Sequence, residues 1–139
     1  MYNNVAELWT QWKPVVGLAL KYKVDRIVER DGTLAVTLIE CCDDGKIVVT
    51  CVGVIAARSV TELFRYRLIS ELDKKCGTEF YAAWTFFKVE NSRYAEWVRS
   101  SQVSNSDVDD GMHFSIVGSN LIVDVLATRD PKIELIKDA

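Results

Sequence analysis

A stretch of alternating residues followed by an Asp-Gly pair constrains the fold of this chain more than any other feature. Between Leu18 and Glu29 apolar side chains alternate with charged ones, as in Leu20-Lys21-Tyr22-Lys23-Val24-Asp25. A period of two predicts a β-strand with one face in water. Asp31-Gly32 then predicts a hairpin turn, and residues 33–40 predict the partner strand.

The length of this turn follows from the apolar faces of the two strands. A two-residue turn would pair Val28 with Ala35 and place the apolar side chains of the second strand on the charged face. A three-residue loop, 30–32, with Gly32 in the left-handed conformation brings the apolar faces together. We therefore predict a bulged three-residue loop. It gives the pairs Val28–Leu34, Arg26–Val36 and Val24–Leu38.

Further strands are predicted along the chain. The turn Asp43–Lys46 leads into residues 47–57, which are apolar on both faces and predict a central, covered strand that completes a three-stranded antiparallel meander. An aromatic-rich run and three later apolar runs predict the rest of the sheet, with two hairpins among the last three. These strands are expected at residues 80–89, 113–117, 121–127 and 132–136.

Three segments have helical patterns. Val5, Leu8, Trp9 and Trp12 recur at three-and-four spacing in residues 3–12. Residues 59–77 begin with a capping-box spacing, and residues 92–102 follow a predicted N-cap at Asn91 or Ser92. The expected fold is a single α+β domain, 1–139. Its curved, mostly antiparallel sheet has about six or seven strands, as in a half-barrel, with two or three helices.

Composition excludes several classes of protein. The net charge is -3 and the basic residues do not cluster, so nucleic acid is not an expected partner. The longest apolar run near the start, residues 15–20, is too short for a membrane span or the core of a signal peptide. We therefore expect a cytoplasmic protein that has no membrane partner.

The four cysteines do not predict a metal site. Cys41, Cys42, Cys51 and Cys76 lack the CxxC or Cys/His spacing of a tetrahedral zinc site. We expect them to be reduced and packed in the sheet as small apolar side chains. No glycine-rich phosphate loop is present either, so no cofactor is predicted.

His113 is the single histidine and the main candidate for chemistry. It could act as a general base, but the chain has no GxSxG or other nucleophile signature, so a structural or contact role is favoured. Asp124 interrupts the apolar run 121–127, and a buried carboxylate is costly unless it is paired. We predict that Asp124 pairs with His113, as a structural hydrogen bond rather than an active-site dyad.

The C-terminal half of the chain resembles a known class of protein. The order of Ser92, Tyr94 and Trp97, then His113 beside an aromatic residue, then residues 124–126 resembles small bacterial proteins, some of which are immunity proteins of toxin systems. The resemblance covers about 40 residues. It implies binding to a toxin made by the same cell and carries over no catalytic residue.

These observations predict a non-enzymatic protein that acts by binding another protein. Its more specific form is an immunity protein that neutralises a bacterial toxin. An acidic surface would steer it to a basic partner. The predicted contact residues are Asp43, Asp44, Asp107, Asp109, Asp110 and His113. One alternative is a small-molecule-binding protein or enzyme with a pocket between sheet and helices that involves His113. Another is a homodimer joined through an exposed strand edge.

Overall fold

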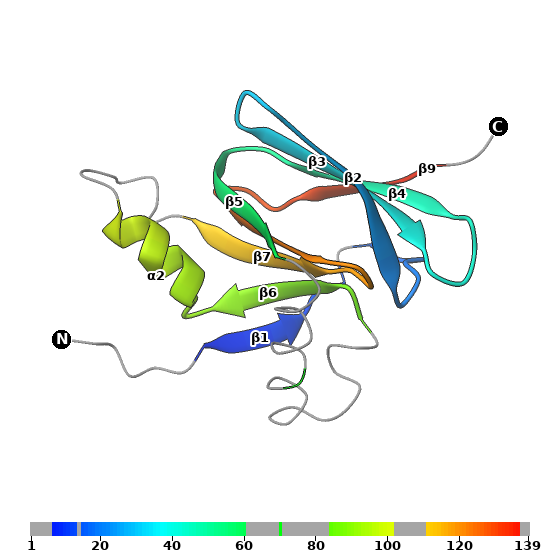
Figure 1. Cartoon of the computed structure of the whole chain (residues 1–139), viewed down its shortest axis with the longest axis horizontal. Coiled ribbons are helices and arrows are strands. Elements are labelled where there is room, and N and C mark those ends of the chain that lie inside the picture. Colours follow the sequence, from blue (N-terminus) through cyan, green and yellow to red (C-terminus); the bar gives the residue numbers. More distant parts are fainter. Residues whose placement is uncertain (1–6, 14, 61–69, 71–83, 102–110, 137–139) are drawn as a thin grey trace.

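Two antiparallel sheets form the described part of the protein (Figure 1). The computed structural model describes residues 7–13, 15–60, 70, 84–101 and 111–136. The first sheet has the order β1-β6-β7-β8-β5, with bounds Leu8–Gln11, Phe86–Glu90, Met112–Val117, Ile122–Ala127 and Val54–Val60. The second has the order β2-β3-β4-β9, with bounds Tyr22–Arg30, Thr33–Glu40, Lys46–Cys51 and Lys132–Ile136.

The predicted meander is confirmed in β2, β3 and β4, but the predicted loop between β2 and β3 is wrong. Val28 pairs with Ala35 across a two-residue turn, Asp31-Gly32, in which both residues have positive φ. A bulge at Asp25 shifts the register inside β2 and restores the predicted pair Val24–Leu38. The extra residue that aligns the apolar faces therefore lies inside the strand and not in the turn.

The predicted continuous strand over residues 47–57 is wrong, because the chain changes sheets there. β4 ends at Cys51, Gly53 turns the chain with a φ of 64°, and β5 pairs with β8 of the first sheet. The predicted hairpin between residues 121–127 and 132–136 is also wrong, because the chain changes sheets between them. β7 and β8 form a hairpin as expected, but β9 leaves β8 and pairs with β4.

The predicted N-terminal helix is also wrong. Residues 8–11 form β1, which pairs with β6 and places Trp9 opposite Val89. The Trp9 ring packs against Phe87, with the ring centroids 5.9 Å apart. A short segment with helical spacing thus gains more from pairing with a sheet edge than from a marginal isolated helix.

One of the three predicted helices is confirmed. α2, Arg93–Ser100, begins after Ser92, whose side chain accepts the backbone N–H of Ala95. Ser59, the expected cap of the second helix, lies in β5. Within the rest of that predicted helix only Ser70 is described, and it is helical, while residues 61–69 and 71–83 are outside the described residues. The α+β prediction, with one curved sheet of about six or seven strands and two or three helices, is therefore wrong. The described residues are mostly strand, in two sheets of five and four strands, with one complete helix.

The core lies between the two sheets. Tyr22 of β2 and Phe86 of β6 meet there, with ring centroids 5.9 Å apart, and both are fully buried. α2 adds a smaller cluster on the first sheet, where Tyr94, Ala95 and Val98 pack against Leu126. The sheets are thus joined by an apolar layer, and the N-terminus of α2 is fixed beside the end of β6.

Truncation of a side chain in this layer should strongly destabilise the protein. Leu38 is fully buried in β3, so we expect Leu38→Ala to lower the free energy of unfolding by about 2–5 kcal/mol. Urea unfolding followed by tryptophan fluorescence measures this. Thr37→Ala, on the opposite face of the same strand, is the matched control. A comparable loss in the two variants would contradict this assignment of the core.

Candidate functional site

A chain of polar side chains runs from the start of α2 into the first sheet. The Ser92 hydroxyl lies 2.7 Å from Nδ1 of His113, and Nε2 of His113 lies 2.8 Å from Oδ1 of Asp124. Nε of Arg58 lies 3.1 Å from the other carboxylate oxygen, Oδ2. The predicted pair of His113 and Asp124 is therefore confirmed, and it is part of a chain of four residues.

The strand register places three of these residues on one face of the sheet. Asp124 of β8 lies directly opposite Arg58 of β5 and Ser115 of β7. His113 is two residues before Ser115, so its side chain points to the same face. Ser92 lies between β6 and α2. Because α2 packs on this same face of the sheet, Ser92 is the fourth member of the polar chain.

The direction of each hydrogen bond follows from the chemistry of the groups. An ionised Asp124 can only accept, so Nε2 of His113 donates to it. In a neutral imidazole Nδ1 then accepts the Ser92 hydroxyl proton, while the Ser92 oxygen accepts the Ala95 N–H. From the N-terminus of α2 to the Asp124 carboxylate, the hydrogen bonds of this polar chain therefore all point in one direction.

Asp124 stays charged although it is only 2% exposed. Burial by itself would raise the pKa of Asp124, but the hydrogen bond from His113 and the charge of Arg58 hold that pKa below its ordinary value. Ser115 lies opposite, but its buried Oγ has no hydrogen-bond partner, so we assign the lowering to His113 and Arg58.

Aromatic rings enclose the polar chain. The Tyr94 and Trp9 rings meet the His113 ring edge to face, with centroids 5.5 Å and 6.1 Å away. The Arg58 guanidinium lies 4.2 Å from the Tyr94 ring centroid, in a cation–π contact. These rings leave His113 only 4% exposed. Low access of water strengthens the electrostatic interactions inside the chain.

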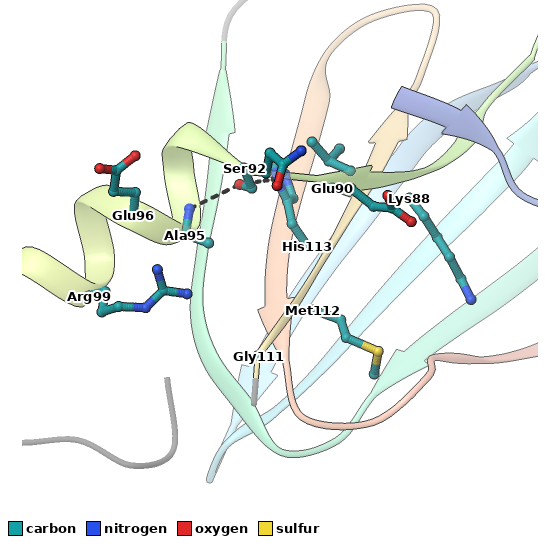
Figure 2. Close-up of a pocket in the computed structure, with 11 residues that line it drawn as sticks. Lys88, Glu90, Ser92, Ala95, Glu96, Arg99, Gly111, Met112 and His113 are labelled. Atoms are coloured by element: carbon teal, nitrogen blue, oxygen red, sulfur yellow. Dashed lines mark hydrogen bonds between the residues drawn. The ribbon is translucent and has the colours of Figure 1, made fainter. Parts of the chain in front are cut away.

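An open cavity of about 860 Å³ lies at the start of α2, and both Ser92 and His113 belong to its lining (Figure 2). Asn91, between β6 and Ser92, has a left-handed φ of 54°. The other polar side chains of the lining carry charges of both signs. They are Lys88, Glu90, Glu96 and Arg99.

The acidic residues predicted from the sequence are not brought to this site by any described contact. Asp43 and Asp44 are exposed in the turn between β3 and β4 of the second sheet. Asp107, Asp109 and Asp110 are outside the described residues. His113, the sixth predicted contact residue, is buried with both ring nitrogens in hydrogen bonds, so it presents little surface to a protein partner.

Sequence reasoning missed two members of the polar chain, Ser92 and Arg58. The sequence predicts Asn91 or Ser92 as the helix cap, but nothing in the local pattern places Ser92 beside His113. An arginine partner for Asp124 is compatible with the sequence, but nothing in the pattern identifies Arg58, which follows the predicted strand 47–57, as that arginine. The signal for Arg58 is Asp124 itself, because a buried carboxylate is stabilised by a nearby cation as well as by a neutral hydrogen-bond donor.

The thiols differ from the prediction. Cys41 and Cys42 are exposed in the turn after β3 and do not pack in the sheet, whereas Cys51 is buried as expected, and all three are free. Burial raises the pKa of the Cys51 thiol to about 11. Among the described residues no three His, Cys, Asp or Glu side chains gather as metal ligands.

Two further findings bear on identity. Among the residues that the structure describes, no helix is long and apolar enough to cross a membrane. No family model, curated protein or solved structure matches the chain. The function must therefore be inferred from the geometry.

The charge of Asp124 should make stability depend on pH in the acid range. Because its folded pKa lies below the ordinary value of 3.8, Asp124 stabilises the fold above that pH. The contribution is lost as the pH falls through the folded pKa. We expect Asp124→Asn to lower the free energy of unfolding by about 3 kcal/mol at pH 7. Below about pH 4 the free energies of unfolding of the variant and the wild type should approach each other. Urea unfolding over a pH series measures both. A difference that stays constant into strong acid would contradict an ionised Asp124.

The thiols should react in two classes. In a Cys76→Ser background, an excess of a disulfide reagent at pH 8 should modify Cys41 and Cys42 rapidly. Cys51 should react only as the protein unfolds, because it is buried and its pKa is about 11. Absorbance of the released thiolate counts the groups, and Cys51→Ala in the same background is the control. Rapid reaction of all three thiols would contradict the burial of Cys51 in β4.

Proposed function

We propose that this protein acts by binding another protein through the outer face of its second sheet. The strand register defines this surface, which we call the basic-rimmed face. Its centre holds uncharged, half-buried side chains of β3 and β4, namely Ala35, Thr37, Ile39, Val48 and Thr50. Its rim holds exposed charged side chains, namely Lys23, Arg26, Arg30, Lys46, Lys132 and Glu134.

The single observation that supports binding is the contrast between the centre and rim of this face. The centre forms adjacent pairs across the ladder, such as Thr37 with Val48 and Ala35 with Thr50. No described helix or strand covers it, since α2 packs on the first sheet. An apolar or uncharged centre within a charged rim is the usual anatomy of a protein–protein interface.

The charge of the rim indicates the chemistry of the partner. Five of its six charged residues are cations, and the one carboxylate, Glu134, already lies 3.3 Å from Nζ of Lys132. Such a rim attracts an acidic protein surface and steers its approach. This differs from the acidic contact surface expected from the sequence, of which Asp43 and Asp44 are the described members.

The finer form of the proposal is neutralisation of a bacterial toxin. The resemblance around Ser92, His113 and Asp124 supports it, and a rigid sheet face suits occlusion of a toxin surface. In that form the toxin would present an acidic patch to the basic-rimmed face.

Charge reversal on the rim should abolish capture of the partner. We expect Lys46→Glu combined with Lys132→Glu to reduce a captured acidic protein at least about tenfold, because two attractive contacts become repulsive. Affinity capture from the native cell extract, quantified by mass spectrometry, measures this. Arg93→Glu combined with Arg129→Glu gives the same change in net charge away from the face and should leave capture unchanged.

Two outcomes would contradict the proposal. One is that the Lys46→Glu, Lys132→Glu variant captures every protein that the wild type captures. The other is that Asp43→Lys with Asp44→Lys abolishes capture while the rim variant does not, which would assign binding to the acidic turn. Unfolding curves of all the variants test whether a loss of capture is caused by a loss of folding.

A further inference from the structure

The polar chain beside the cavity has the parts of a serine nucleophile site. Such a site needs a hydroxyl within hydrogen-bond reach of a base and a third group that orients the base. Ser92, His113 and Asp124 meet these conditions at 2.7 Å and 2.8 Å. Arg58 in turn holds Asp124, so the orienting carboxylate is itself fixed. The roles of the imidazole nitrogens are reversed relative to the common serine triad, because here Nδ1 faces the serine.

The backbone at Ser92 supports the same inference. β6 ends at Glu90, α2 begins at Arg93, and the turn between them contains Asn91 in the left-handed conformation. A sharp strand-to-helix turn also exposes the nucleophile in α/β-hydrolases, although there the nucleophile itself is the strained residue of a GxSxG pattern, whereas Ser92 has an extended backbone with φ -68° and ψ 125°.

The surroundings of Ser92 favour negative charge on its oxygen. The oxygen accepts the Ala95 N–H at the N-terminus of α2, where the helix dipole is positive. Arg99 lines the same cavity and adds a positive charge to it. The cavity of about 860 Å³ is large enough for a small organic ester beside Ser92.

We propose that Ser92 and His113 form a catalytic site for the cleavage of carboxylic esters, with Asp124 as a positioning residue. The Ser92 oxygen attacks the ester carbonyl carbon while its proton passes to Nδ1 of His113. The tetrahedral intermediate then expels the alcohol, which takes the proton from Nδ1 and leaves an acyl group on Ser92. Water attacks this acyl group with His113 again as the base, releasing the carboxylic acid and restoring the hydroxyl.

The first experiment is covalent labelling of Ser92. A fluorophosphonate should add one phosphonyl group to Ser92 with loss of fluoride, and peptide mass spectrometry identifies the residue. Ser92→Asn is the key variant, because asparagine is as good an N-cap as serine but has no hydroxyl. It should fold and gain no adduct at position 92.

The second experiment measures turnover of p-nitrophenyl acetate over a pH series, below the melting temperature of every variant. We expect Ser92→Asn to abolish enzyme-dependent hydrolysis. His113→Gln, which keeps a hydrogen-bonding side chain, should slow it at least about 100-fold and remove the pH dependence due to the base. A purely structural role of His113 would instead lower the melting temperature without changing the rate.

The proposal is overturned if wild-type protein gains no adduct on Ser92 or if Ser92→Asn hydrolyses the ester as fast as wild type. These results are independent of the proposed protein binding, because the basic-rimmed face belongs to the other sheet. Retention of hydrolysis by the Lys46→Glu, Lys132→Glu variant would be the expected control result.

Discussion

The buried charge of Asp124 is the constraint on which the rest of the first sheet depends. A carboxylate that is 2% exposed requires donors on either side, and the sheet supplies them from two neighbouring strands. His113 then faces Asp124, and its second nitrogen meets the Ser92 hydroxyl at the start of α2. One costly side chain therefore links β5, β7, β8 and α2 in a single arrangement.

This arrangement also explains how the two sheets are joined. β8 carries Asp124 on one face and buried apolar residues such as Val123 and Val125 on the other, so both of its faces are covered. The chain reaches the first sheet through Gly53 and leaves it before β9. Both of these crossovers join the first sheet to β4 and β9, which are adjacent strands of the second sheet.

Binding and chemistry are proposed for separate parts of the molecule. The basic-rimmed face lies outside the second sheet, whereas Ser92 and His113 are beside α2 on the first. The apolar core between the sheets separates them, so a partner on the rim need not cover the cavity. The polar chain also has a structural effect, because it caps α2 and fixes it to the sheet whether or not Ser92 reacts.

The amino-acid sequence by itself determined the local features of this protein: the β2–β4 meander, the β7–β8 hairpin, the Ser92 cap and the need of Asp124 for a partner. Each depends on neighbours in the sequence or on the cost of one buried group. Only the tertiary structure decided that residues 8–11 form a strand, that residues 47–57 divide between sheets, and that Ser92 and Arg58 complete the polar chain. Those outcomes depend on pairing between segments far apart in sequence, whose energies outweigh the weak local preferences of short segments.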